Sequence, residues 1–409
     1  MAKLLFLSIK KRHPIKKKSL PQTARSFKIA LRTLELVYSL INVSLILILK
    51  YLLVEILILK IQFIYQKGYS MKVVIALDTE DILSETAPDA QLWWAQELHK
   101  RNIKATFQIV GEMARKLERL KRFDVIDAIK EHDIGYHTNY HSIHPTHPEG
   151  IEGMSLEDSV NWIIQHEESG IQDIERLFGT KPFSYTTPGL SWTPATLLAN
   201  HHFGIKVSFV GPYTSRYLPY WYCGQLIVDY GHKLNFEQSF REDCNEESFF
   251  IQLGRLKEKL KGIDATVTIY THPGRIFTAN HWDLVYKNGM NPSIEEATPP
   301  PYWPEGHSDK IKKRVTNILD RLLEDPDIEF TDIQTVYHNH QHNKFDMENI
   351  KSQTPSGEYI PLLERAESHD LFNEAIGDFD YSSWVPHVEG FNPKNVFEHI
   401  EGLAWTTKI

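Results

Sequence analysis

Between residues 71 and 331 the sequence alternates short apolar runs with longer segments of helical periodicity, and this alternation constrains the fold most. The apolar runs cover residues 72–77, 105–110, 134–136, 182–185, 205–210, 265–270 and 328–331. The helical segments cover residues 90–101, 111–131, 155–178, 194–201, 249–260 and 308–324. Short strands that alternate with amphipathic helices are typical of parallel sheets, whose strands are connected by helices. About seven or eight such units predict an α/β protein with a distorted parallel (β/α) barrel of seven or eight strands.

Two stretches rich in Pro, Trp and Tyr interrupt the alternation, at residues 211–248 and 278–307. We expect them to form long aromatic loops over the mouth of the barrel, where they either stack on sugar rings or fill the core. Residues 336–409 contain further aromatic side chains and are expected to be a C-terminal extension that packs on the barrel. The predicted domains are therefore a leader at 1–70, a barrel at 71–335 and this extension.

The leader has a composition unlike the rest of the chain. It holds thirteen of the 45 lysines and arginines but only two of the 53 acids, Glu35 and Glu55. Residues 34–64 are nearly all apolar, yet the run between Glu35 and Lys50 is shorter than the roughly 20 residues of a clean membrane span. Three interpretations stay open: a membrane anchor, an over-long translated start before Met71, and an amphipathic surface helix. With an anchor the body lies outside the cytoplasm, and otherwise it is cytoplasmic.

The composition of the body excludes several classes of protein. Its acids outnumber its bases, which argues against nucleic acid as a partner, because phosphate binding needs a basic surface. Two cysteines, Cys223 and Cys244, cannot build a disulfide framework or a four-sulfur zinc site. The chain has 20 histidines, and several of them cluster, which indicates metal or acid–base chemistry.

Polar side chains follow several of the apolar runs, at the points where the strands are expected to end. They are Asp78, Asp81, His137, Thr187 and His272. Active sites of parallel barrels are built at the carboxyl ends of the strands, so we expect these side chains to meet at one edge of the sheet.

The pair His137 and His141 predicts a metal site. Histidines four residues apart project to one side of a helical turn, where both imidazoles can reach one cation at about 2.0–2.1 Å. The acids after the first run provide one carboxylate for the metal and one for general-base chemistry. His272 would supply an acid on the opposite side of the site.

At these residues the chain resembles the polysaccharide deacetylase family, the NodB-homology metal hydrolases, over residues 71–335. The blocks that carry the resemblance are, in order, Asp78-Thr79-Glu80-Asp81, His137-Thr138-Asn139-Tyr140-His141, Pro188-Gly189 with Ser191-Trp192-Thr193-Pro194, and Thr271-His272. They are similar to the family's paired-aspartate, histidine, arginine–proline and leucine–histidine blocks. The arginine that orients the base in the family is absent before Pro188, and Arg275 is the candidate replacement.

The resemblance implies a distorted barrel of about seven strands. It also implies a divalent metal, Zn²⁺ in the first place, with Co²⁺ and Mn²⁺ as alternatives. The implied roles are the base Asp78, the acid His272, the metal ligands Asp81, His137 and His141 with Glu80 as the alternative to Asp81, and the substrate-binding residues Thr187, Trp192 and Tyr222.

The implied function is metal-dependent hydrolysis of a non-peptide C–N amide bond, foremost N-deacetylation of an N-acetylated sugar or polysaccharide. Two alternatives stay open: an allantoinase-like small-molecule amidase of the same superfamily, and an inactive barrel that binds glycans through its aromatic loops. The expected partner is a glycan or a small amide, and a membrane only where the leader is a genuine anchor. The oligomeric state has no signature in the sequence.

Overall fold

The computed structural model describes residues 31–35, 37–38, 70–188, 192–210, 219–222, 225–230, 234–262 and 265–341. The chain divides into two compact units, residues 1–68 and 69–409. In the first unit the described residues are 31–35 and 37–38, which are helical. Among all helices in the described residues, none is long and apolar enough to cross a membrane. The expected leader and C-terminal extension fall almost entirely outside the described residues, so both stay predictions.

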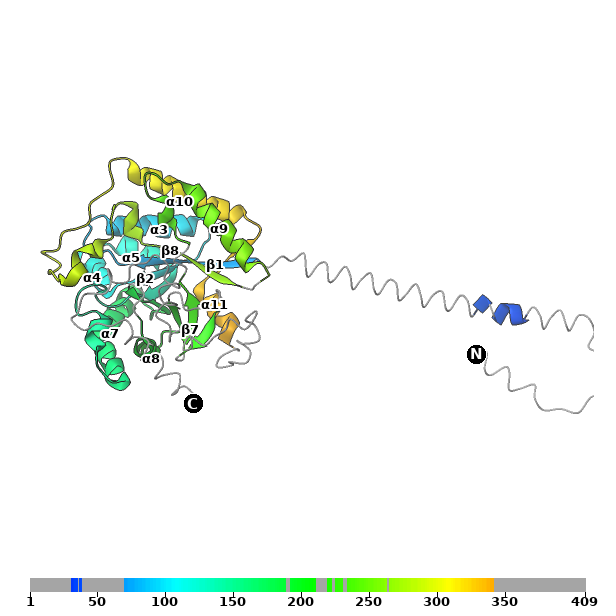
Figure 1. Ribbon diagram of the computed structural model, residues 1–409, viewed down its shortest axis with the longest axis horizontal. Helices are drawn as coiled ribbons and strands as arrows, with labels where there is room; N and C mark the ends of the chain where they lie inside the picture. The colour runs from blue at the N-terminus through cyan, green and yellow to red at the C-terminus, as the bar shows by residue number, and fades with distance from the viewer. Residues whose placement is uncertain are drawn as a thin grey trace, which may run out of the picture. The chain divides into compact units, whose positions relative to one another are not determined.

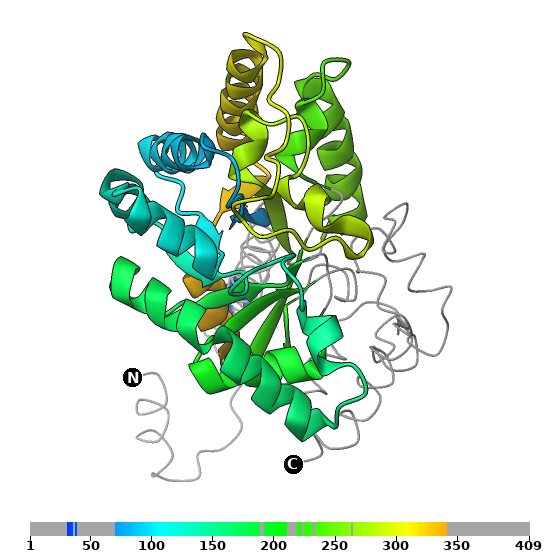
Figure 2. The ribbon, with the colours of Figure 1, turned by 90° about the vertical axis from the view of Figure 1, so that its left-hand side faces the viewer.

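A mainly parallel sheet forms the centre of the second unit, with helices around it (Figures 1 and 2). Its strands are β1 (Met71–Thr79), β2 (Thr106–Ile109), β3 (Asp133–Tyr136), β4 (Ser184–Thr186), β5 (Val207–Val210), β6 (Tyr220–Tyr222), β7 (Gln225–Asp229), β8 (Thr266–Thr271) and β9 (Ile328–Phe330). The strand order is β6-β7-β5-β4-β3-β2-β1-β8, with β9 beside β1. All described pairings are parallel except that of β6 with β7.

The parallel part of this sheet ends at β7 and β8, and these two ends approach each other. An isolated parallel bridge between Asn235 and Tyr270 connects the segment after β7 to β8. Seven parallel strands from β7 through β1 to β8 therefore curve into a distorted β/α barrel. This confirms the fold class that the alternation of strands and helices predicts.

Helices occupy the connections between the strands and surround them in Figure 2. They are α3 (Ala87–Lys100), α4 (Gly111–Arg119), α5 (Phe123–Ile129), α6 (His147–Ile151), α7 (Leu156–Phe178), α8 (Pro194–Phe203), α9 (Glu246–Leu260), α10 (His307–Glu324) and α11 (Ile333–His340). Short 3₁₀ helices are η2 (Phe236–Ser239), η3 (Pro273–Ile276) and η4 (Trp282–Gly289). The longest helix, α7, begins as its sequence predicts, because Ser155 Oγ accepts the backbone N–H of Asp158 at 3.1 Å.

Strand β1 lies inside the sheet and is buried on both faces. Every residue from 73 to 77 is fully buried, as a parallel strand covered on both sides requires. Val73, Ile75 and Leu77 pack in the main core beneath the helices. Val74 and Ala76 belong instead to a cluster with side chains of β5, β7 and β8, which is the interior of the barrel. Because the side chains of a strand alternate, Asp78 continues the interior face.

The structure corrects two local expectations. Residues 111–131, expected as one helix, form α4 and α5, because Lys121 adopts a left-handed conformation (φ 56°) that ends the first helix. The stretch 211–248, expected as a loop, contains β6 and β7. In β7, Leu226 to Val228 are buried beside β5, but the surrounding Pro, Tyr and Trp hide this short apolar run in the sequence.

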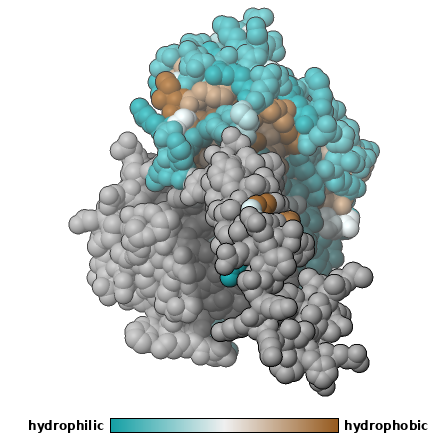
Figure 3. All heavy atoms as spheres, turned by 90° about the vertical axis from the view of Figure 1, so that its right-hand side faces the viewer, coloured by the Kyte–Doolittle hydropathy of each residue, from teal (hydrophilic) through white to brown (hydrophobic). Residues whose placement is uncertain are grey.

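The surface of the described residues is mostly hydrophilic on the face shown in Figure 3, with a small apolar group in its upper part. Exposed large apolar side chains of the second unit include Ile251, Met290 and Leu323, which come from different segments. Single exposed apolar side chains of this kind are normal on protein surfaces and do not by themselves indicate an interface.

Candidate active site

The polar residues that follow the strands meet at the carboxyl edge of the barrel. Asp78 is in the last part of β1 and Glu80 follows directly, His137 follows β3, and His272 follows β8. Strand β1 pairs with β2 and β8, and β2 pairs with β3, so these ends are neighbours in the sheet. Asp78, Glu80 and His137 are at most 3% exposed. The site therefore lies inside the protein, not on its surface.

His137 and His141 lie on a loop, and the expected helical turn is absent. Thr138 and His141 have φ angles of 64° and 56°, in the left-handed region that a right-handed helix excludes. The loop is closed by a hydrogen bond from His141 N to Thr138 Oγ1 of 3.0 Å. Glu167 of α7 stabilises the loop, because its Oε2 accepts the backbone N–H of Asn139 at 2.7 Å. The two imidazoles still converge, with ring centroids 4.8 Å apart.

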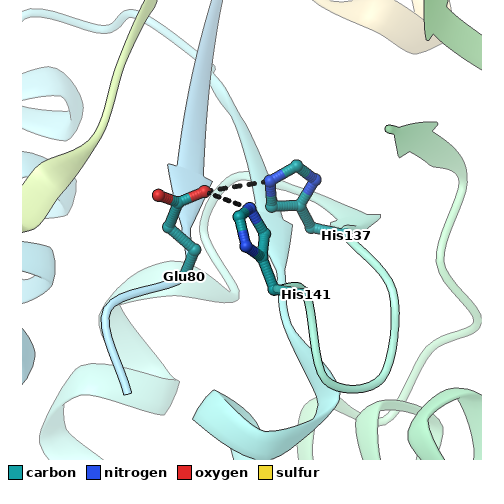
Figure 4. Close-up of side chains that lie close together, drawn as sticks. All are labelled: Glu80, His137 and His141. Atoms are coloured by element: carbon teal, nitrogen blue, oxygen red, sulfur yellow. Dashed lines mark hydrogen bonds and ion pairs between the residues drawn. The ribbon is translucent and has the colours of Figure 1, made fainter. Parts of the chain in front are cut away.

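Glu80 faces both imidazoles (Figure 4). Its Oε2 lies 3.1 Å from His137 Nε2 and 2.8 Å from His141 Nε2. Its Oε1 accepts the indole N–H of Trp282 at 3.1 Å. The ligand atoms of Glu80, His137 and His141 all lie within 4.8 Å of one another, which suits three protein ligands of one metal ion. We call these three residues the metal triad.

Hydrogen bonds on the far side of each ring leave both Nε2 atoms available for a cation. His137 Nδ1 lies 2.8 Å from the carbonyl oxygen of Thr186, which can only accept, so this nitrogen carries a proton. His141 Nδ1 lies 2.7 Å from Ser142 Oγ, whose own hydrogen goes to Asp283 Oδ2 at 2.9 Å. In the neutral imidazoles both Nε2 lone pairs face the same Glu80 oxygen, and these three acceptors repel one another unless a cation or a proton lies between them. Two imidazoles and one carboxylate fit Zn²⁺ and similar divalent ions.

The ionised form of Glu80 is favoured despite its burial. Burial by itself raises the pKa of a carboxyl group, but His141, His272 and the hydrogen bonds from the imidazoles outweigh it and hold the pKa of Glu80 well below its usual range. An ionised carboxylate is the form that binds a metal ion.

Asp81, which the family resemblance makes a ligand, lies in a different environment. Its Oδ1 accepts the backbone N–H groups of Leu83 at 3.1 Å and Ser84 at 2.8 Å, so it caps the turn after β1. Gly274 packs against it, since a Cβ there would lie 2.9 Å from Asp81 Oδ2. The structure thus does not bring Asp81 to the two histidines and places Glu80, the alternative ligand, beside them.

Asp78 lies next to the metal triad and is bound by Tyr230. The Tyr230 hydroxyl donates to Asp78 Oδ2, whereas no donor in the described residues reaches Oδ1. His272 Nε2 is 3.6 Å from Oδ2. Burial raises the pKa of Asp78, and the nearby histidines and the Tyr230 hydrogen bond offset part of this increase. Tyr230 therefore contacts the candidate base, for which the family resemblance implies an arginine that this chain lacks.

Glu237 of η2 orients His272. Its Oε1 lies 2.6 Å from His272 Nδ1 and accepts the His272 backbone N–H at 2.9 Å. Burial lowers the pKa of His272, but the charges of Glu237 and Glu80 outweigh it and raise that pKa to about 10.

Arg275 Nε is 3.4 Å from Glu237 Oε2, so Arg275 pairs with this carboxylate and does not replace the missing arginine at the base. His281 packs edge-on against His272 at 4.6 Å between centroids, and burial together with His272 lowers the pKa of His281 to about 4.

The expected substrate-binding residues are less well placed. Thr187 follows β4 and is 3% exposed, and Trp192 is 1% exposed, which leaves no open face of its indole for a sugar ring. Tyr222 ends β6, but its side chain lies outside what the structure describes. The substrate-binding roles of these three residues stay predictions.

Five residues of the site were not predicted: Tyr230, Glu237, His281, Trp282 and Asp283. They belong to the two stretches interpreted as aromatic loops, and their partners are far away in sequence, 152 residues for Tyr230 and Asp78 and 202 for Trp282 and Glu80. The signal that could have found them is topological. Each stretch adjoins a barrel strand at its carboxyl end, so acids and aromatic residues in it can return to the same edge of the sheet.

No protein-family model and no curated protein matches this chain. Solved structures do match it in fold. A Mycobacterium smegmatis protein provisionally named a polysaccharide deacetylase is 14% identical, with a TM-score of 0.46 over 68% of this chain and 92% of that one. PuuE allantoinase is 12% identical, with a TM-score of 0.44 over 68% of this chain and 91% of that one. A family 4 acetyl xylan esterase from Clostridium thermocellum, in complex with a cobalt ion, is 15% identical, with a TM-score of 0.37 over 66% and 92%.

These matches include both kinds of enzyme that the sequence resemblance names, a polysaccharide deacetylase and an allantoinase. At such low identity they concern the fold alone. The activity of this chain has to be argued from its own site.

Proposed function

We propose that this protein is a metal-dependent hydrolase of non-peptide C–N amide bonds, which removes acetyl groups from an N-acetylated sugar or polysaccharide. The observation that carries the proposal is the buried cluster in which Asp78 and His272 lie beside the metal triad. A metal ion with a general base and a general acid next to it is what hydrolysis of an unreactive amide needs. In this proposal Glu80 takes the place of Asp81 as the third metal ligand.

When bound to Glu80, His137 and His141, a divalent metal would act as a Lewis acid toward the amide carbonyl group. The protein's own residues move the protons. Asp78 accepts the proton that a water molecule releases as its oxygen bonds to the carbonyl carbon. His272 Nε2 gives its proton to the amide nitrogen as the C–N bond breaks, so acetate and a free amine leave the site.

The contacts of His272 and Asp78 suit these opposite roles. Glu237 holds His272 Nδ1, which leaves Nε2 as the donor, and a pKa of about 10 keeps the imidazole protonated at neutral pH. Tyr230 donates to one oxygen of Asp78 and thereby favours its ionised form, which is the form that accepts a proton. Two titratable groups with different environments thus supply an acid and a base in one site.

The burial of the cluster favours a second candidate, an amidase of the allantoinase type that acts on a small molecule. Asp78, Glu80, His137 and His141 are at most 5% exposed. A polymer needs an open groove over the reacting atoms, whereas a small amide can enter a narrow opening. Both candidates take a glycan or a small amide as the partner and exclude nucleic acid.

Metal content and product analysis test the proposal. The full chain is dialysed against Zn²⁺, its metal is quantified by mass spectrometry, and acetate and ammonia are measured after incubation with N-acetylated oligosaccharides and with small amides. We expect tightly bound zinc and acetate release, both lost in His137→Ala and both retained in His201→Gln, a control at an exposed histidine of α8.

Each other outcome points to a different function. Metal binding with ammonia from a small amide and no acetate from any glycan favours the allantoinase-type amidase. A wild-type chain that binds no metal contradicts both enzymes, and glycan binding without turnover then supports the inactive barrel.

A further inference from the structure

A second pair of histidines faces the other oxygen of Glu80. Oε2 of Glu80 contacts the two histidines of the metal triad, whereas its Oε1 lies 3.9 Å from His272 Nε2. Glu80, His272 and His281 form another group whose ligand atoms all lie within 4.8 Å of one another. One carboxylate thus stands between two pairs of imidazoles, as a carboxylate does when it bridges two cations.

The distances around His272 Nε2 suit a shared ion better than direct hydrogen bonds. Asp78 Oδ2 lies 3.6 Å away and Glu80 Oε1 3.9 Å away, both longer than the roughly 2.7–3.2 Å of an ordinary hydrogen bond. Two ligand atoms that bind one ion at about 2.1 Å lie about 3.0–4.2 Å from each other, depending on the angle at the ion. Because Glu237 occupies Nδ1 at 2.6 Å, the Nε2 atom is the one that faces these oxygens.

A histidine binds a metal ion in its neutral form, and once His272 has lost its proton the charge of the site favours another cation. The cluster contains the carboxylates of Asp78, Glu80, Glu237 and Asp283. Among the described residues, Arg275 pairs with one of them, Glu237. Oδ1 of Asp78 and Oδ1 of Asp283 are buried, and no hydrogen-bond donor in the described residues reaches either. Buried carboxylate oxygens without donors are costly unless positive charge compensates them.

We propose that Glu80, His272 and His281 form a second divalent-cation site, which shares Glu80 with the metal triad. Binding is expected to be weaker here than at the triad, because Trp282 Nε1 already donates to the Glu80 oxygen on this side and because the cation displaces the proton that His272 Nε2 carries in the proposed function. A cation on His272 Nε2 occupies the atom that donates the proton in the proposed function. Filling the second site therefore inhibits hydrolysis, and this consequence rests on the proposed function, whereas the site itself does not.

Equilibrium dialysis of the metal-free full chain against increasing Zn²⁺ tests the site through its stoichiometry. Wild type and the surface control His201→Gln are expected to share one binding curve with two saturable steps, the second weaker than the first. His281→Gln loses the weaker step, His137→Ala loses the tighter one, and Glu80→Gln weakens both because the two sites share this carboxylate.

Loading with Mn²⁺ gives a readout that scattered surface histidines do not produce. Two Mn²⁺ ions bridged by Glu80 at about 3.5–4 Å show spin coupling in the electron paramagnetic resonance spectrum. This coupling is expected in wild type and is lost in both His281→Gln and Glu80→Gln. Circular dichroism checks that the variants are folded. Where a variant is not folded, the presence or absence of spin coupling in the wild-type electron paramagnetic resonance spectrum decides whether the second site exists.

The second site is overturned by a wild-type spectrum without coupling, or by a His281→Gln binding curve equal to that of wild type. The inhibitory consequence is measured as the ratio of hydrolysis rates at low and high Zn²⁺ for each variant. We expect the hydrolysis rate of wild type to fall by about 100-fold or more from low to high Zn²⁺, since general acid catalysis contributes about 10²–10⁴-fold. The fall should be much smaller in His281→Gln. If no amide is hydrolysed at all, the proposed function fails while stoichiometry and spin coupling still decide the second site.

Discussion

Tyr230 makes the one hydrogen bond that the described residues donate to the Asp78 side chain, so Tyr230→Phe isolates this bond. The ring of Tyr230 is buried, with its centroid 6.3 Å from that of Phe209 and 4.7 Å from that of Tyr270. Phenylalanine keeps these packing contacts. The substitution therefore removes the hydroxyl group and little else.

The size of the effect follows from the kind of bond. A hydrogen bond to a charged group contributes about 1.5–3 kcal/mol, which corresponds to a decrease of about 10- to 150-fold in kcat when the bond orients the base in the transition state. The Tyr230 hydrogen bond lowers the pKa of Asp78 and so opposes the effect of burial. Without it the pKa of Asp78 rises further, and a base with a higher pKa becomes active only at higher pH. The acid limb of the kcat/KM profile is thus expected to move to higher pH.

Acetate release as a function of pH, together with bound zinc, measures both effects. Zinc content should stay at the wild-type level, because the Tyr230 hydroxyl donates to Asp78, which does not belong to the metal triad. Tyr185→Phe is the matched control, a fully buried tyrosine without a described bond to Asp78. Wild-type kcat and an unshifted acid limb in Tyr230→Phe would refute the assignment of Asp78 as a base oriented by Tyr230.

Three further predictions concern the acid, the metal and the fold. Glu237→Gln removes the charge that raises the pKa of His272 to about 10, so this pKa should fall by about 1–3 units and the alkaline limb of the kcat/KM profile should move to lower pH. NMR titration of the imidazole measures the pKa, and an unchanged value would contradict the pairing of His272 with Glu237. Asp283→Asn weakens the hydrogen-bond relay behind one metal histidine and should lower zinc affinity by about 10- to 100-fold in competition with a chelator, whereas wild-type affinity would show that the relay does not orient the ligand. Gly135→Ala places a Cβ against the buried Oε1 of Gln108 and should lower the free energy of unfolding in urea by about 1–3 kcal/mol. Gly254→Ala, which has open space on helix α9, should raise it by about 0.5–1 kcal/mol, and the opposite order would contradict the packing.

Local periodicity was sufficient to predict most of the barrel, because a strand buried on both faces and an amphipathic helix each leave a pattern in consecutive residues. The runs at 72–77, 105–110 and 265–270 became β1, β2 and β8 with small shifts at their ends. The predictions failed where periodicity does not record what decides the structure, which is a neighbouring strand in one case and a single backbone conformation in the other. Strand β7 is buried by β5, and the break between α4 and α5 depends on the left-handed backbone of Lys121.

The sequence by itself determined that Asp78, His137, His141 and His272 would gather, because the carboxyl ends of parallel strands share one edge. It did not determine which acid after β1 would face the histidines. Residues 73–77 are apolar throughout, so nothing in their order shows which face of the strand is inside the barrel.

The tertiary structure made that choice. Val74 and Ala76 pack in the interior, Asp78 continues their face, and Glu80 reaches the histidines while Asp81 caps a turn against Gly274. Tyr230 and Glu237 likewise join the site only through folding, since they contact Asp78 and His272 across 152 and 35 residues. Periodicity records which residues are buried, whereas the partner of a buried polar group depends on where distant segments of the chain meet.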